Sequence, residues 1–314
     1  MGLVHWDDVD RHRLAKGEMD AVWQRLGHAA GAVGVGMNRN TVAPGRLPTP
    51  PHSHGASEEL YYVLSGSGLA WQDEAVHEVR PGDCVIHVAD HFEHTFIAGN
   101  EGLELLVFGT LHPTEYGWLP RSRAVRLGWP WVEGRHDDPW EIEAAGPPLA
   151  VPEPSPRPDN IVNVDEVEQH LDDRWVSAPL ATDERSRQAG LHWEHLNPGH
   201  RGSPPHCHSE EEELFVILEG GATLELWPPP AREARGEERE DVPVGPGHVI
   251  ARPPGSRVAH SFLAGPDGVT MLIYGTRRPN DIAWFPRSRK MFWRGVGVIG
   301  RIETLEYRDG EPDD

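Results

Sequence analysis

Two histidines one residue apart, followed by a glutamate, form the first candidate for chemistry in this chain. His52 and His54 precede Glu59, which opens an apolar run. Side chains at positions i and i+2 of an extended chain point to the same face, so the two imidazoles face one way. Burying them beside a carboxylate without a partner would be costly. A divalent metal ion removes that cost, because it neutralises the carboxylate and binds the nitrogen lone pairs.

The same arrangement recurs 154 positions later, and a further histidine follows downstream in each copy. Three histidines and one glutamate make a mixed nitrogen and oxygen donor set, suited to Mn, Fe, Co, Ni or Zn. Four protein ligands leave coordination positions open, as a catalytic metal requires. We therefore predict one divalent transition metal per copy, held by His52, His54, Glu59 and His94 and by His206, His208, Glu213 and His260.

The duplication covers most of the chain. A second repeated stretch, FGTLHPTEYGWLPRSR at 108–123 and YGTRRPNDIAWFPRSR at 274–289, has an offset of 166. The 12 additional residues fall near 227–243, a Pro-rich charged stretch that predicts a longer loop. A fainter echo links VHWDDV near the start of the chain with VNVDEV after residue 160.

We infer two units of a size typical of domains, at residues 1–150 and 151–314. The boundary lies in the Pro-rich stretch 144–160, which proline holds extended as a linker. Within each unit, short apolar or alternating runs are broken by Gly and Pro, the pattern of strands. A helix is expected near Asp20, in DAVWQRLG, with short pieces after the linker. The predicted fold is all-β, each unit being a small barrel or double-sheet roll.

Composition excludes several classes of function. The 314 residues are 38% hydrophobic and 25% charged, which fits a globular protein. The net charge of −21 argues against binding to nucleic acid or to an anionic membrane surface. No stretch has the length of a signal peptide core or of a membrane span. Two cysteines far apart exclude a disulfide framework and fit a reducing cytosol, so we expect a cytoplasmic, bacterial protein.

The repeated segments resemble those of a bicupin, a two-domain member of the cupin superfamily. The first cupin motif, G-x5-H-x-H-x3,4-E-x6-G, is nearly met twice, with one extra residue after the first glycine of each copy. Its spacing selects Glu59 over Glu58, and Glu213 over the three glutamates before it. The matching residues are Gly45, His52, His54, Glu59 and Gly66, and Gly199, His206, His208, Glu213 and Gly220.

The second cupin motif, G-x5-P-x-G-x2-H-x3-N, is weaker. Pro253 and Gly255 precede His260 with two additional residues, whereas Ala89 and His91 stand at the proline and glycine positions of the first copy. The resemblance implies tandem double-stranded β-helix (jelly-roll) barrels, each holding a metal through three His and one Glu. It leaves the oligomeric state open, because further self-association into homo-oligomers is common in the family.

Other residues near the ligands have two interpretations each. Aromatic side chains that share parity with ligands are expected to line a substrate pocket or to pack in the core: Tyr61, Phe96, Phe215 and Phe262. Arg257, three residues before His260, either clamps a substrate carboxylate or lies in solvent. Cys207 points away from the histidines beside it, which favours a structural or surface role over a thiolate one.

The resemblance extends to several activities. Bicupin relatives include oxalate decarboxylases, oxalate oxidases and quercetin-type dioxygenases. We therefore expect a metal-dependent enzyme of oxidoreductase (dioxygenase-like) or decarboxylase type, acting on a small organic molecule. The alternative is a non-catalytic, metal-containing protein that binds or senses a small molecule, and a third is a metal-independent structural protein. No proton-transfer group is evident in the sequence.

Overall fold

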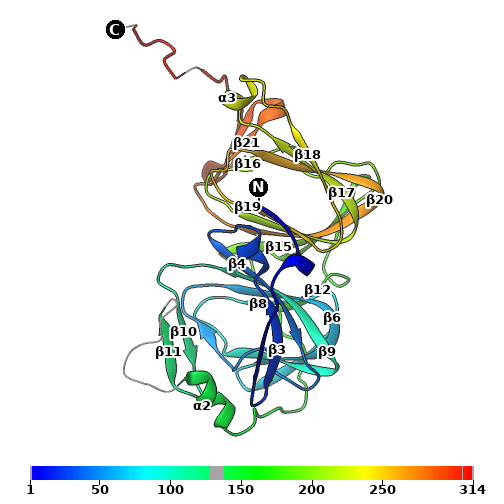
Figure 1. Cartoon of the computed structure of the whole chain (residues 1–314), viewed down its shortest axis with the longest axis vertical. Helices are drawn as coiled ribbons and strands as arrows, with labels where there is room; N and C mark the ends of the chain where they lie inside the picture. Colours follow the sequence, from blue (N-terminus) through cyan, green and yellow to red (C-terminus); the bar gives the residue numbers. More distant parts are fainter. Residues whose placement is uncertain (1, 128–137, 306, 313–314) are drawn as a thin grey trace.

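Two stacked barrels, each built on an eight-stranded antiparallel sheet, make up the computed structural model (Figure 1). It describes residues 2–127, 138–305 and 307–312. This architecture confirms the prediction of an all-β chain with tandem jelly-roll barrels. No helix within those ranges is long and apolar enough to cross a membrane.

The sheet of the first barrel runs in the order β12-β8-β6-β9-β4-β3-β2, and β7 pairs with β6. Its strands are β2 (His12–Lys16), β3 (Met19–Gln24), β4 (Val35–Val42), β6 (Glu59–Gln72), β7 (Ala75–Val79), β8 (Asp83–His87), β9 (His94–Thr110) and β12 (Ile161–Asn163).

The sheet of the second barrel runs in the matching order β1-β19-β17-β20-β15-β14-β13, and β18 pairs with β17. Its strands are β1 (Gly2–His5), β13 (His170–Leu171), β14 (Trp175–Ala181), β15 (Ala189–Leu196), β17 (Glu213–Trp227), β18 (Glu240–Val244), β19 (His248–Arg252) and β20 (Ala259–Thr276).

A small sheet closes one side of each barrel and contains the second histidine of each pair, His54 or His208. The first has the order β11-β10-β5 and the second the order β16-β21-β22-β23. Their strands are β5 (Ser53–His54), β10 (Tyr116–Leu119) and β11 (Ala124–Leu127), and β16 (Cys207–His208), β21 (Ile282–Phe285), β22 (Lys290–Trp293) and β23 (Val298–Arg301).

Helices are short and peripheral. The α-helices are α1 (Leu26–Ala29), α2 (Pro139–Ala145) and α3 (Pro230–Glu233), and the 3-10 helices are η1 (Trp6–Asp8), η2 (Pro286–Ser288) and η3 (Arg294–Val296). The expectation of a helix near Asp20 was wrong in its extent, because residues 19–24 form β3 and only residues 26–29 are helical. Tertiary pairing decided this, since β3 is hydrogen-bonded between β2 and β4.

The two halves of the chain exchange strands. The N-terminal β1 pairs with β19 of the second barrel, from Gly2 opposite Ala251 to His5 opposite His248. In return, β12, which follows the linker, pairs with β8 of the first barrel. These are the segments of the faint VHWDDV and VNVDEV echo. Each sheet is therefore completed by a strand from beyond the predicted boundary near residue 150, and Figure 1 shows the N-terminus lying against the upper barrel.

The longest strands are apolar on both faces because both faces are buried. In β6, Leu60 and Tyr62 belong to a core cluster shared by both barrels, whereas Tyr61 and Val63 belong to the interior of the first barrel. Phe108 and Tyr274 stack across the shared core, their ring centroids 5.2 Å apart. A separate cluster fills the second barrel. Burial on both faces explains why the strand sequences run continuously apolar instead of alternating.

Two buried glutamates join the barrels reciprocally. Glu58 accepts hydrogen bonds from Ser186 Oγ (2.7 Å) and from the backbone N–H groups of Arg187 (3.0 Å) and Gln188 (2.9 Å). Its counterpart Glu212 accepts from two N–H groups of the loop before β4, at 2.9 and 2.6 Å. Each of these glutamates directly precedes a predicted metal ligand. The two consecutive carboxylates therefore point in opposite directions, one to the barrel interior and the other to the interface between the barrels.

Candidate metal centres

Backbone pairing brings the histidines together in the same way in both barrels. His52 and His94 exchange backbone hydrogen bonds of 3.1 and 2.8 Å, and His206 and His260 exchange bonds of the same two lengths. Both glutamates open the long central strand of their sheet. The glycine that ends the motif is required sterically, because Gly66 has a φ of 77° and a Cβ there would lie 2.2 Å from a carbonyl oxygen.

In the first barrel all four predicted ligands converge, with donor atoms within 4.8 Å of one another. The Nε2 atoms lie 3.7 Å (His52), 3.3 Å (His54) and 3.3 Å (His94) from one carboxylate oxygen, Oε2 of Glu59. Metal–ligand bonds of 2.0–2.2 Å at 90–110° would separate neighbouring donors by about 3.0 to 3.5 Å. These separations thus fit donors around one ion.

In the second barrel the compact group consists of His206, Glu213 and His260. Their Nε2 atoms lie 3.8 Å (His206) and 3.0 Å (His260) from Glu213 Oε2. His208 stands at the edge of this group, with its Nε2 3.6 Å from the same oxygen. The structure therefore places all three predicted histidines within 3.8 Å of Glu213 Oε2, although only His206 and His260 form the compact group with it.

Hydrogen bonds on the far side of the imidazoles fix their tautomers. The Nδ1 atoms of His52, His94 and His206 lie 3.0, 3.1 and 2.8 Å from backbone carbonyl oxygens. A carbonyl only accepts, so Nδ1 carries a proton, and in the neutral form of each ring the Nε2 lone pair is the one turned toward the glutamate. Lone pairs facing a carboxylate need a cation between them, and this is the usual arrangement of metal-bound histidine.

Buried atoms without partners support the same conclusion. His54 Nε2, Glu213 Oε2 and His260 Nε2 are fully buried and make no hydrogen bond to any residue that the structure describes. Buried polar atoms in native proteins are normally satisfied, so such a convergence calls for a missing partner. One divalent metal in each barrel, bound by imidazole and carboxylate, would satisfy these atoms.

The electrostatics of the groups show strong coupling. Burial would raise the pKa of Glu59, but the three neighbouring histidines hold it well below its ordinary value. Burial likewise lowers the pKa of His54, yet the charges of Glu59 and Glu115 outweigh it and raise that pKa to about 10. In His94 and in His260 burial prevails, and each pKa falls to about 4.

A further carboxylate in each barrel was missed by sequence reasoning. Glu115 Oε1 lies 3.2 Å from Nδ1 of His54, and Asp281 Oδ2 lies 2.6 Å from Nδ1 of His208. The two acids hold equivalent positions in the stretch repeated at an offset of 166, which was the available signal. Both also accept backbone N–H groups from the loop after the histidine pair. They orient the second histidine of each pair in the manner of a carboxylate–histidine–metal unit.

The predicted aromatic residues lie inside the barrels, beside the ligands. Tyr61 and Phe96 are 4% and 0% exposed in the first barrel, and Phe215 and Phe262 are 4% and 5% exposed in the second. The hydroxyl group of Tyr61 donates to Glu59 at 2.6 Å, an interaction that Phe215 cannot make.

The barrels also differ at the position opposite the glutamate. His87 faces Glu59 in strand register and stacks on His94 with ring centroids 3.8 Å apart, whereas Arg252 faces Glu213. Arg252 is 7% exposed and donates to the Val258 carbonyl at 2.6 Å. Sequence reasoning missed both residues.

A small chamber adjoins the second group. It has a volume of about 50 Å³ and is lined by the predicted ligands His206, Glu213 and His260, by Phe215 and Phe262, and by Glu194, Leu196, Gly202, Ser203, Ser261, Met271 and Ile273. Arg257 is exposed, has a φ of 61° and does not line this chamber. Cys207 is buried, and burial raises the pKa of its thiol to about 11, which opposes thiolate chemistry.

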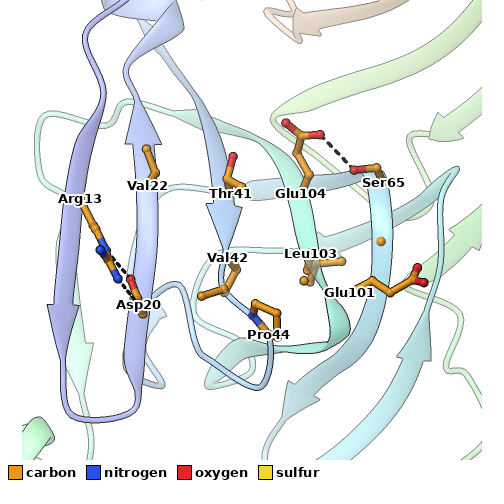
Figure 2. Close-up of a pocket in the computed structure, with 13 residues that line it drawn as sticks. Arg13, Asp20, Val22, Thr41, Val42, Pro44, Ser65, Glu101, Leu103 and Glu104 are labelled. Carbon is orange, nitrogen blue, oxygen red and sulfur yellow. Dashed lines mark hydrogen bonds and ion pairs between the residues drawn. The ribbon is translucent and has the colours of Figure 1, made fainter.

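A larger pocket, of about 430 Å³, lies on the outer side of the first barrel (Figure 2). Arg13 pairs with Asp20 there at 2.7 Å, and the Ser65 hydroxyl donates to Glu104. None of the predicted ligands lines it. Its polar groups satisfy one another, so volume alone does not make it the preferred site.

Comparison with known proteins places this geometry in a family. Residues 38–109 match the family described as the cupin domain, and structures of tandem barrels superpose on both halves of the chain. Residues 38–109 are thus a cupin domain, and the whole chain has the fold of a bicupin, with two tandem barrels. No curated protein matches it by sequence.

The solved structures that are similar to this chain belong to different classes of protein. An oxalate decarboxylase of Lactobacillus farciminis in a formate complex has a TM-score of 0.60 at 12% identity, covering 88% of this chain and 86% of that one. An oxalate decarboxylase of Bacillus subtilis, elsewhere described by its Mn(II) centres, has a TM-score of 0.59 at 13% identity, covering 87% and 75%. Procruciferin, an 11S globulin of Brassica napus, has 0.59 at 14%, covering 89% and 86%. At these identities the likeness describes the fold.

Proposed function

We propose that this bicupin is a metal-dependent enzyme that acts on a small organic molecule through oxidoreductase (dioxygenase-like) or decarboxylase chemistry. The observation that carries the proposal is the convergence of imidazole Nε2 atoms on one carboxylate oxygen in each barrel. His52, His54, Glu59 and His94 would hold one divalent transition metal, and His206, His208, Glu213 and His260 the other. A metal bound there would supply Lewis-acid or redox chemistry.

The second barrel is the better candidate for catalysis. Its chamber opens beside the ligands and has apolar walls, including Phe215 and Met271, which would exclude bulk water. Arg252 lies opposite Glu213 in strand register, and its positive charge would offset that of the glutamate. The chain's own residues would thus bind and orient the molecule and shield it from solvent.

The first barrel favours the second candidate role, the binding of a metal without catalysis. The Tyr61 hydroxyl and the histidines all approach Glu59 Oε2, and His87 stacks flat on His94. These contacts surround the ligands with protein groups, as in a site that serves affinity or stability. Cytoplasmic location in a bacterium and self-association stay predictions.

Metal analysis followed by a gas-exchange screen tests the proposal. The purified protein should contain close to two equivalents of Mn, Fe, Co, Ni or Zn, and His52→Ala and His206→Ala should each lose one. Small organic acids and enols are then screened for oxygen uptake and carbon dioxide release. Oxygen uptake would identify an oxidoreductase, and carbon dioxide release without it a decarboxylase. Bound metal without turnover would favour the binding role, and no metal after reconstitution would refute both.

A further inference from the structure

Glu194 lies between two cavities of the second barrel. It lines the chamber of about 50 Å³ beside His206, Glu213 and His260, and it also lines an outer pocket of about 360 Å³. Gly202 and Ser203 are shared by both cavities too. The outer pocket is lined by Arg174, Trp175, Glu194, Arg201, Gly202, Ser203, Pro204 and Arg287. Glu194 therefore stands where a small molecule would pass from the outer pocket into the chamber.

Strand alternation accounts for this position. Glu194 lies on β15 opposite Met271 of β20, and Leu196, two residues further on, belongs to the interior cluster of the second barrel. Side chains two positions apart share a face, so the carboxyl group of Glu194 points inward with Leu196. An inward carboxyl group packed among apolar side chains such as Leu196, Phe215 and Met271 is unusual and marks a candidate functional group.

The carboxyl group has no partner of its own. Glu194 makes no hydrogen bond or ion pair with any residue in the described part of the chain, and burial raises its pKa to about 7. Neighbouring glutamates do have partners: Glu211 pairs with Arg278 and Arg294, and Glu213 faces the histidines. Glu194 therefore changes its protonation near neutral pH without breaking any hydrogen bond to the described residues.

The charged groups facing Glu194 set the polarity of both cavities. On the chamber side are His206, Glu213 and His260, and His192 shares the inward face of β15. Three arginines line the outer pocket: Arg174 pairs with Asp172, Arg201 pairs with Glu225, and Arg287 has no ion pair within the described residues. This arginine-rich lining suits an incoming anion.

The first barrel lacks this group. Val35 pairs with Thr110 as Ala189 pairs with Thr276, so Asn40 of the first barrel is the counterpart of Glu194. Asn40 is 1% exposed and its Oδ1 has no hydrogen-bond partner among the described residues. An amide does not gain or lose a proton near neutral pH, so only the second barrel has a titratable group at this position, although the predicted ligands of the two barrels match.

We propose that Glu194 is the proton-exchanging group of the second barrel, taking up one proton when a small carboxylate enters the chamber. The proton comes from solvent and bonds to a carboxylate oxygen of Glu194, so the negative charge that enters with the ligand is matched. A volume of about 50 Å³ corresponds to room for about three to five water molecules, which suits a ligand of acetate size. The inference rests on the proposed function, because the metal would bind the incoming anion.

Acetate binding with a count of protons tests this inference. The metal-loaded protein is titrated with acetate in a calorimeter, in buffers of different ionisation enthalpy, between pH 5.5 and 8.5. The wild type should take up close to one proton per acetate at pH 8.5 and almost none at pH 5.5, and its Kd should rise about tenfold per pH unit above pH 7. Glu194→Gln should bind acetate with no proton uptake and a flat pH profile.

The matched control is Asn40→Asp in the first barrel, which should leave the proton count of the second unchanged. Infrared spectra should show a protonated carboxyl band at pH 6 in the wild type that Glu194→Gln lacks, independent of ligand. Equal proton uptake in wild type and Glu194→Gln, or no acetate binding, would overturn the inference. Metal content is measured on the same samples. Metal absent from the second group would refute the proposed function, and the infrared comparison, which needs neither metal nor ligand, would then decide whether Glu194 holds a proton near pH 6.

Discussion

Replacing Asp281 by asparagine should weaken metal binding in the second barrel while leaving the fold intact. Asp281 is 1% exposed and accepts hydrogen bonds from His208 Nδ1 (2.6 Å) and from the N–H groups of Glu210 (2.9 Å) and Glu211 (3.2 Å). Although burial opposes ionisation, these donors hold the pKa of Asp281 well below its ordinary value, so the group is charged at neutral pH. Asparagine removes the charge and keeps one of the two acceptor oxygens, so either His208 or the loop N–H groups lose their acceptor.

The magnitude follows from the strength of that contact. A hydrogen bond to a charged group contributes about 1.5 to 3 kcal/mol, against about 0.5 to 1.5 kcal/mol for a neutral pair. Losing this difference of about 1 to 2 kcal/mol makes His208 less basic and less well oriented. If the whole difference is taken from the free energy of metal binding, the affinity falls about 5- to 30-fold. This lies within the range typical for groups that support a metal ligand. Glu115 should matter less, because its contact to His54 is longer, at 3.2 Å.

The assay uses competition with a chromophoric chelator in single-site proteins. His52→Ala removes the first group, so bound Mn(II) or Co(II) reports the second, with and without Asp281→Asn. Glu115→Gln in a His206→Ala background provides the matched comparison for the first barrel. Unchanged affinity in Asp281→Asn, with wild-type circular dichroism, would show that the contact does not support the ligand.

Three further expectations concern stability. Glu58→Gln should lower the free energy of unfolding in urea by about 2 to 4 kcal/mol, because it weakens three buried hydrogen bonds. The control Glu184→Gln, at an exposed position, should change it by less than about 0.5 kcal/mol. Equal effects of the two substitutions would contradict the role given to the interface. Tyr61→Phe should destabilise the metal-free protein by about 1 to 3 kcal/mol, because Glu59 loses a hydrogen-bond donor. Saturating Mn(II) should reduce this loss of stability, because the metal neutralises Glu59. Thermal unfolding with and without metal checks both expectations. The folded-state pKa of Glu194 is raised from 4.5 to about 7, so the stability that its protonated form contributes is fully present below pH 4.5 and lost as the pH rises through 7. Over this range the free energy of unfolding of the wild type should fall by about 3 kcal/mol relative to that of Glu194→Gln. Parallel pH profiles of the two proteins in urea unfolding would refute this.

The ligand positions were predictable because they depend on local rules. Alternation places His52 and His54 on one face, and the structure brings them to Glu59 as the spacing indicated. The duplication made the second barrel predictable from the first. The long-range partner His94 was found only because its strand repeats around His260, since sequence separation alone says nothing about which strands pair.

The groups around the ligands were not predictable, because tertiary pairing decides them. Asp281 reaches His208 only because β21 pairs with β16. Glu194 looks like an ordinary surface residue in LHWEHLNP, and only the curvature of the barrel turns that face of β15 inward. Arg252 was hidden for the same reason: its position opposite Glu213 follows from strand register.

The fold class followed from the many short apolar runs, but the connection between the barrels did not. Residues 2–5 and 161–163 are too few for their sequence to indicate a pairing partner. The exchange is decided by the sheet edges that they complete, at β19 and β8. The longer second-copy loop was predicted near 227–243, and α3 and the start of β18 lie there.

The strand exchange also orders the events of synthesis. β1 leaves the ribosome first, but β19, its hydrogen-bonding partner, is made about 240 residues later. At about 5 to 20 residues per second, the N-terminal strand waits on the order of 10 to 50 seconds for that partner. The first barrel gains its last strand, β12, well before the second barrel can close. The start of the chain is thus among the last parts to be fixed, and a nascent chain halted before residue 248 would hold a finished first barrel with an unpaired leading strand.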